Sequence, residues 1–406
     1  MWWGWAVVAA VAIGYSAFSK RLDRGFVTAP MVFVALGALV APAGLGLVEV
    51  DLDGDLTKAL FKVTLAILLF SEASTIDLAG LRRDSGLVAR LLGIAMLLLI
   101  IVGAATALVL FGVLTFWEAA VVSVILAPTD AALGAAVVSN PRVPARIRRT
   151  LIVESGLNDG LALPLALMFT AAALAQLGLE TKGDALTFML EQIGYGVIAG
   201  VVLGAAAGWL IRYAIQKQWT DAEWTKFSTL AIALLSYAGA EAVHGNGFIA
   251  AWVAGFVFGH VVRAEAPHVE EFGERLGKVL TVVSFFVFGA TMLAPAFSIV
   301  TWQMVLYGLL SLALLRPLPV AIGMVGTKLP WQSVAFLGWF GPRGIASIII
   351  VAIVIKEAGL PGDDIIVTIT TVTVALSVYL HGLTAVPGAE RFASWHENQS
   401  KAVSES

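Results

Sequence analysis

The chain has 406 residues, of which 59% are hydrophobic and only 13% are charged, and its formal net charge at pH 7 is −3. Soluble domains are about 25% charged, and the mean hydropathy here is +0.91, so the composition excludes a soluble protein and predicts one that lies almost wholly within a membrane. The small net charge gives no reason to expect a nucleic-acid partner, and the lack of cysteine excludes disulfides and thiolate sites.

Thirteen apolar stretches are candidates for membrane spans, which need about 20 apolar residues each. We therefore predict an all-α polytopic membrane protein. The first stretch has neither a basic segment before it nor a small-residue cleavage site, so we expect a span rather than a signal peptide. Residues 389–406 are expected to form a short polar tail that frays. The predicted spans are 3–18, 28–43, 57–76, 86–113, 116–140, 150–177, 187–213, 226–243, 247–264, 277–296, 300–326, 332–356 and 364–386.

Basic residues are distributed unevenly over the predicted loops. Most of the 25 lysines and arginines follow odd-numbered spans. Because basic loops remain in the cytoplasm, this asymmetry predicts a protein of the plasma or inner membrane with its N-terminus outside and its C-terminus in the cytoplasm. The loop at 141–149 contributes most to this prediction, with Arg142, Arg146, Arg148 and Arg149.

Two predicted spans are interrupted at equivalent places. Pro128 interrupts the fifth span, and residues 341–344, which include Pro342, interrupt the twelfth; proline removes a backbone donor and so favours a break. If the seventh span is a linker, each break lies in the fifth span of a six-span half, and the halves have opposite orientations, as in inverted-repeat transporters. The predicted division is a first repeat (1–177), a linker helix (178–222), a second, inverted repeat (223–388) and the tail (389–406).

The predicted linker helix has a glycine at every fourth position, which predicts close packing against another helix. These glycines are Gly196, Gly200, Gly204 and Gly208.

Among the charged residues within spans, where charge is costly and functional by default, Asp159 has the best set of polar neighbours. Asn158 precedes it, and Glu154 and Ser155 lie one turn earlier, so these polar side chains share one arc of a helix. Asp130 lies on the neighbouring broken span. A monovalent cation stripped of water needs several oxygen ligands, and a buried carboxylate can hold either a proton or a cation. The alternative is a carboxylate held only by structural hydrogen bonds.

Asp130 and Arg343 lie at the two predicted breaks. Broken helices leave N–H and C=O groups unpaired within the membrane. If the two spans cross at their breaks, two positive and two negative helix ends meet there. We expect the acid and the base to neutralise these ends; the alternative is a simple proline kink with a snorkelling charge.

The remaining charges within spans have more structural interpretations. Glu154 and Arg316 are expected to pair, because each is otherwise an unpaired charge within the membrane. Glu72 is a cation ligand, a gate residue or an interfacial acid, and these alternatives stay open. Glu241 is expected to be structural. The five histidines are scattered without metal-binding spacing, so we expect no metal catalysis and no cofactor.

At these residues the chain resembles the NhaP-type sodium/proton antiporters of the monovalent cation:proton antiporter-1 family. The resemblance covers about residues 5–388 and implies a thirteen-helix homodimer with core and dimerisation domains. Its motifs are APTD at 127–130, VESGLNDG at 153–160, LLRPLPV at 314–320, FLGWFGPRGIAS at 336–347 and HGLTAVP at 381–387.

The resemblance also implies roles for individual residues. It places Na⁺ at Asp159 and Asp130, with the ligands Thr129 and Ser155 and with Asn158 nearby. Glu72 matches an acid that completes the site in some members, and Glu154 with Arg316 matches a structural ion pair. Asn158 in place of a second aspartate resembles the electroneutral branch. The chain departs from the family at Gly156, where many members have leucine and where we expect looser packing. We also expect no regulatory C-terminal domain of the kind that larger relatives have.

We therefore predict a secondary active antiporter that exchanges Na⁺ or another monovalent cation for H⁺. Cation and proton would compete for one carboxylate site that opens alternately to each side. A K⁺/H⁺ or mixed exchanger is an alternative, because ligand types alone do not fix the cation radius. An intramembrane aspartyl enzyme is more remote, since its usual YD and GxGD pairs are replaced here by TD and ND. A channel is a third alternative.

Overall fold

The computed structural model describes residues 2–22, 26–50, 54–76, 78–130, 133–178, 185–265, 271–352 and 359–404. Within these ranges the protein is helical and has no β-strand, as the sequence predicts. Six of the described helices are long and apolar enough to cross a membrane, and four shorter helices are also apolar. The count of thirteen spans stays a prediction, and the end of the predicted twelfth span lies outside the described residues.

The helices up to the middle of the chain are α1 (Trp2–Leu22), α2 (Ala29–Val40), α3 (Asp55–Thr75), α4 (Leu78–Arg90), α5 (Met96–Leu110), α6 (Phe116–Ile125), α7 (Ala135–Val138) and α8 (Ala145–Gln176). They are followed by α9 (Ala185–Gln216), α10 (Ala222–Ala242), α11 (Gly247–Val262), α12 (Glu271–Phe288), α13 (Ala294–Ala296), α14 (Trp302–Leu310), α15 (Pro317–Gly323), α16 (Trp331–Trp339), α17 (Ile345–Ile350) and α19 (Asp363–Ser404). Single π-helical turns join three pairs, namely η1 (Leu91–Ala95) between α4 and α5, η2 (Gly289–Leu293) between α12 and α13, and η3 (Ser311–Leu315) between α14 and α15.

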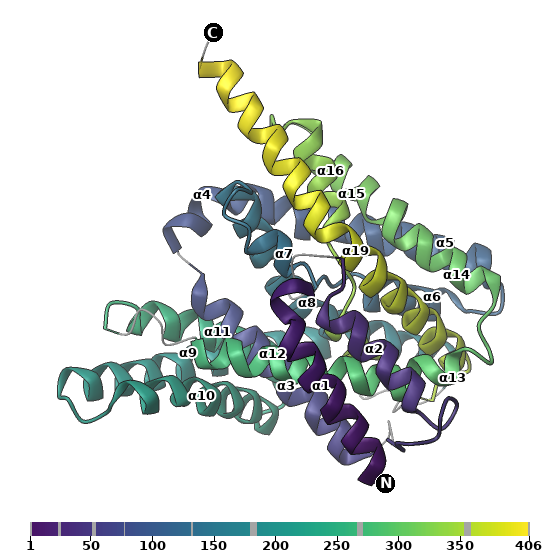
Figure 1. Ribbon diagram of the computed structural model, residues 1–406, viewed down its shortest axis with the longest axis horizontal. Helices are drawn as coiled ribbons and strands as arrows, with labels where there is room; N and C mark the ends of the chain where they lie inside the picture. Colours follow the sequence, from purple (N-terminus) through teal and green to yellow (C-terminus); the bar gives the residue numbers. More distant parts are fainter. Residues whose placement is uncertain are drawn as a thin grey trace.

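The glycine stripe of α9 lies against α11, and the two helices run side by side with α10 (Figure 1). A Cβ atom added to Gly200 would lie 2.7 Å from the carbonyl oxygen of Ala250, and one added to Gly204 would lie 2.7 Å from Cα of Ala254. Larger residues would push the backbones apart, so the stripe permits the close approach that its spacing predicts.

Two helices are interrupted near the centre of the molecule. The helix α6 ends at Ile125 and α7 begins at Ala135, while α16 ends at Trp339 and α17 begins at Ile345. The two breaks cross, because the amide N–H of Asp130 in the first donates to the carbonyl oxygen of Pro342 in the second over 2.8 Å. This crossing positions the polar residues described below.

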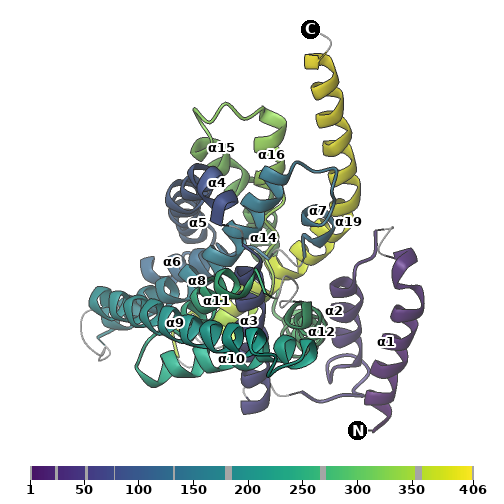
Figure 2. The ribbon, with the colours of Figure 1, turned by 90° about the vertical axis from the view of Figure 1, so that its left-hand side faces the viewer.

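The last helix continues beyond the predicted span, and its end stands away from the other helices (Figure 2). The expectation that residues 389–406 fray is therefore wrong as far as Ser404. Phe392 stacks on Phe336 of α16 with ring centroids 4.1 Å apart, and Glu397 accepts from Nε of Arg142 at 2.8 Å. These contacts outside the predicted span stabilise the helix. The hydrogen bonds and the charge of Glu397 also raise the pKa of Arg142.

Candidate functional site

Asp130 binds the backbone of both broken helices. Its Oδ2 accepts from the amide of Ile345, the first residue of α17, at 3.0 Å, and its Oδ1 accepts from the amide of Leu133 at 3.3 Å. Both amides lie at or just before the start of a helix segment, where the helix dipole is positive. The carboxylate is thus placed where a negative charge stabilises the two helix starts.

Arg343 lies at the negative end of a helix in the same crossing. Its side chain is fully buried, and Nη1 donates to the carbonyl oxygens of Ala127 at 3.2 Å and Pro128 at 3.3 Å. These carbonyls follow the C-terminal end of α6, where the helix dipole is negative. The structure therefore brings Asp130 and Arg343 to the helix ends that the sequence analysis assigned to them.

Thr129 is held by two side chains of α8. Ser155 Oγ donates to its carbonyl oxygen at 2.6 Å. Asn158 donates from Nδ2 to the Thr129 hydroxyl at 2.9 Å and accepts from the Thr129 amide at 3.2 Å. Both ends of the Asn158 carboxamide therefore fix the break, while its predicted place beside a cation stays a prediction.

Asp159 differs from these residues because it has an unpaired oxygen. It is 8% exposed, and its Oδ1 has no hydrogen-bond partner among the described residues. The charges of Glu72 and Asp130 act on this carboxylate. A buried carboxylate oxygen without a partner is costly, and a bound proton or cation would remove that cost.

Glu72 joins this acidic region from α3, where it interacts electrostatically with Asp130 and Glu274. Two helices, α3 and α8, and the first break thus contribute acids to one region. Over the described ranges, however, no three histidine, aspartate or glutamate side chains converge closely enough to hold a metal ion. The arrangement does not form a multidentate carboxylate cage of the kind that divalent ions prefer.

Glu154 and Arg316 form a buried ion pair beside the site. Arg316 donates from Nη1 to Oε1 at 2.8 Å and from Nη2 to Oε2 at 3.0 Å, and both side chains are almost fully buried. Nη2 also donates to the carbonyl oxygen of Leu337 at 3.3 Å. The two-point contact links α8 to the start of α15, and the bond to Leu337 adds α16. It joins the two residues that were expected to pair.

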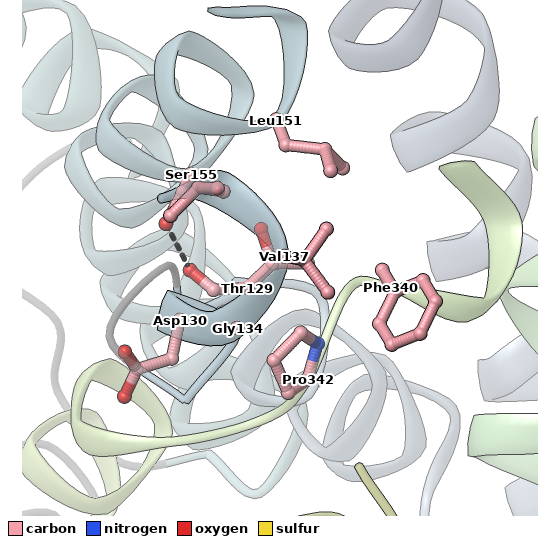
Figure 3. A pocket seen from close by; sticks show the side chains of 9 residues that line it. Thr129, Asp130, Gly134, Val137, Leu151, Ser155, Phe340 and Pro342 are labelled. Carbon is pink, nitrogen blue, oxygen red and sulfur yellow. Dashed lines mark hydrogen bonds between the residues drawn. The ribbon is translucent and has the colours of Figure 1, made fainter. Parts of the chain in front are cut away.

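A pocket reaches the first break (Figure 3). Its polar wall contains Thr129 and Ser155, whose hydrogen bond is drawn there, and the Asp130 carboxylate points away from Pro342. Asp159 is not among the residues that line it. The lining residues are Thr129, Asp130, Gly134, Val137, Val138, Leu151, Ser155, Phe340 and Pro342.

Gly156 does not leave a loosely packed site. A Cβ atom at this position would lie 2.6 Å from Nε1 of Trp252 on α11, so the indole ring occupies the space that a larger residue would fill. The expectation of looser packing is wrong here, because the compensating side chain comes from a helix about a hundred residues away in sequence.

Sequence reasoning missed Glu118, which is buried within the predicted fifth span. Its side chain accepts from the amide of Thr115 at 2.8 Å and from the amide of Gly362 at 2.8 Å. The T-x-x-E pattern of a capping box was the available signal. Glu241 accepts from the amide of Gly247 at 2.9 Å, which gives it the structural contact that was expected.

A family model described as "Sodium/hydrogen exchanger, transmembrane" matches residues 7–391. The chain belongs to this family. The sodium/hydrogen exchanger fold is also found in a solved structure of the sodium proton antiporter MjNhaP1 from Methanocaldococcus jannaschii. That structure matches with a TM-score of 0.73 and 22% identity, over 87% of this chain and 92% of the other.

Curated relatives of this exchanger are named for different cations. The Na(+)/H(+) antiporter NhaP of Pseudomonas aeruginosa is 27% identical over 90% of each chain. The K(+)/H(+) antiporter NhaP2 of Shewanella sp. strain MR-4 is 25% identical over 95% of this chain, which spans 65% of that relative's length.

Proposed function

We propose that this protein is a monovalent cation/proton antiporter in which cation and proton compete for Asp159. The observation that carries the proposal is the buried Oδ1 of Asp159, which has no partner among the described residues, beside a crossing in which both oxygens of Asp130 accept from backbone amides. Protonation and cation binding would each satisfy that oxygen, and neither state would require the crossing to come apart. Alternating access of this one carboxylate would couple the two fluxes.

Asp130 and Thr129 would complete the site from the first break, and Ser155 from α8. In this proposal Asp130 is a charge partner whose oxygens keep their backbone donors, while the hydroxyls and the Thr129 carbonyl supply further oxygens. Glu72 adds a third acid that is coupled electrostatically to Asp159. Asn158 cannot ionise, so the adjacent pair offers one titrating group and exchange is electroneutral.

Na⁺ is the proposed cation, and K⁺ is the second candidate. The Shewanella relative is named a K(+)/H(+) antiporter and the Pseudomonas relative a Na(+)/H(+) antiporter, and both are similarly distant from this chain. The test is a panel of Li⁺, Na⁺ and K⁺ gradients applied to purified protein in proteoliposomes with an internal pH dye. If none of these cation gradients drives proton movement, the proposal is rejected.

An intramembrane aspartyl enzyme is disfavoured by the bonding of Asp130. Such an enzyme needs two carboxylates that share a proton and activate water, whereas both oxygens of Asp130 accept from backbone amides. Peptide cleavage that disappears in Asp159→Asn and in Asp130→Asn would favour the enzyme instead.

The arrangement in the membrane completes the proposal. It includes a homodimer, the two inverted repeats divided at 178–222, an N-terminus outside and a cytoplasmic C-terminus. The arginines at 142–149 support this orientation. The chain has no cysteine, so a single Ser139→Cys replacement at an exposed position should react with impermeant maleimide only from the cytoplasmic side. Labelling from outside would invert the orientation.

A further inference from the structure

The second helix break is bonded to the last helix of the chain as well as to the first break. The backbone amide of Arg343 donates to Oγ of Ser377 on α19 at 2.6 Å. One turn further along α19, Nε2 of His381 lies 2.9 Å from the carbonyl oxygen of Trp339. Ser377 is fully buried and His381 is 1% exposed. Trp339 ends α16 and Arg343 precedes α17 by two residues, so α19 holds both sides of the break.

These contacts form a single directed chain of hydrogen bonds. A carbonyl oxygen only accepts, so Nε2 of His381 must carry a hydrogen. In the neutral imidazole Nδ1 is then an acceptor. It lies 3.1 Å from Oγ and 3.1 Å from the carbonyl oxygen of Ser377, and of these two only the hydroxyl can donate to it. The Ser377 hydroxyl accepts from the Arg343 amide and donates its one hydrogen to Nδ1. Each group in the chain is satisfied when the histidine is neutral.

The same short loop carries the contacts that hold Asp130. Pro342, next to Arg343, accepts from the Asp130 amide at 2.8 Å, and Ile345, two residues beyond Arg343, donates to the Asp130 carboxylate at 3.0 Å. A shift of residues 340–344 would therefore move the acceptor Pro342 and, with it, the donor Ile345 that follows the loop. The contacts with α19 are made to backbone groups of the break, so we assign them an effect on the position of the loop.

We propose that Ser377 and His381 are positioning residues of the cation site, which act on Asp130 through the loop at 340–344. They do not touch the cation. This inference rests on the proposed function, because it assumes that the geometry of Asp130 sets cation affinity.

The test compares two disrupting variants with a conservative variant and a matched control. Ser377→Ala and His381→Leu break the chain of bonds. In His381→Gln the side-chain amide can still donate to Trp339 and accept from Ser377. Thr371→Val removes another buried hydroxyl of α19, one that donates to the carbonyl of Val367 within the same helix. The readouts are the apparent KM and Vmax for Na⁺-driven exchange in proteoliposomes, or for K⁺ if it gives faster exchange, and the rise in Tm caused by that cation.

We expect Ser377→Ala and His381→Leu to raise KM about tenfold, because a buried backbone amide or carbonyl then loses its partner. Vmax should change less, and the cation should stabilise these variants less than it stabilises the wild type. His381→Gln should stay within about threefold of the wild-type KM, and Thr371→Val should match the wild type.

A wild-type KM in Ser377→Ala would overturn the assignment of positioning residues, but it would leave the proposed function standing. If that variant does not fold, the two histidine variants decide the matter, because equal KM values for His381→Leu and His381→Gln would overturn it. A wild-type protein that exchanges none of Li⁺, Na⁺ and K⁺ for protons would instead reject the proposed function, and this inference with it.

Discussion

Asp130 and Asp159 are both buried carboxylates of one polar region, but their surroundings differ. Both oxygens of Asp130 accept from backbone amides at the starts of helix segments. Asp159 instead lies within the unbroken helix α8, and its Oδ1 has no partner among the described residues. The comparison suggests a division of roles, since a satisfied carboxylate holds structure and an unsatisfied one can exchange its ligand.

The substitution Asp159→Asn is expected to have the largest effect, because it should reduce exchange below detection. The variant should also be at least as stable as the wild type, because it removes an uncompensated buried charge. Asp130→Asn should instead lower Tm, because it weakens the charge at two helix starts. Flux in proteoliposomes and thermal unfolding in detergent would measure both. A near-normal cation-driven pH change in Asp159→Asn would contradict the division of roles between Asp130 and Asp159.

Next in size is the loss of one partner from the buried pair of Glu154 and Arg316. Removing one member of such a pair costs roughly 3–5 kcal/mol because the other charge is stranded. We expect Glu154→Ala or Arg316→Ala to lower Tm strongly, with loss of activity as a consequence. Glu397→Ala is the matched control, because its pair with Arg142 is about half exposed and exposed pairs contribute little. A Glu154→Ala protein as stable as the control would contradict this account.

A smaller effect is expected at the contact between Gly156 and Trp252. Gly156→Ala places a methyl group 2.6 Å from the indole nitrogen, and overpacking of this kind costs about 1–3 kcal/mol. Combining it with Trp252→Phe should recover part of the lost stability, so the two changes should not add. Additive losses of Tm in the double mutant would show that the two residues do not share the space.

The smallest expected effect is that of membrane potential, which should be absent. Asn158 is neutral, and one proton replaces one monovalent cation at Asp159, so no net charge moves. A transported charge would be worth about 2.3 kcal/mol per 100 mV. The reversal point of exchange should therefore stay fixed when K⁺ and valinomycin clamp different potentials, with Na⁺ as the tested cation. A reversal point that follows the clamped potential would exclude one-for-one exchange.

Much of this site could be predicted, because its sequence signals either come from neighbouring residues or reflect charges that are costly to bury. The spacing of Ser155, Asn158 and Asp159 fixes a shared helix face, and Pro128 marks a break. Arg316 needed an acidic partner, because an unpaired charge within a membrane is expensive. Each of these inferences uses either a few neighbouring residues or a large energetic penalty.

The rest depends on contacts between distant residues that carry no charge. The amide that binds the Asp130 carboxylate lies 215 positions further along the chain, and any residue except proline supplies such an amide. Ser377 and His381 carry no fixed charge, so their burial gave no signal of comparable strength. The continued helix beyond residue 388 depends on a ring stack with Phe336, which no local pattern indicates.

The central claim is that proton and cation compete for Asp159, and the dependence of KM on pH tests it most directly. Exchange should be measured in proteoliposomes with the potential clamped and the Na⁺ concentration varied at each pH. If both ligands occupy one carboxylate, the apparent KM for Na⁺ rises as pH falls, because protons displace the cation. An apparent KM that does not change with pH would contradict a shared site.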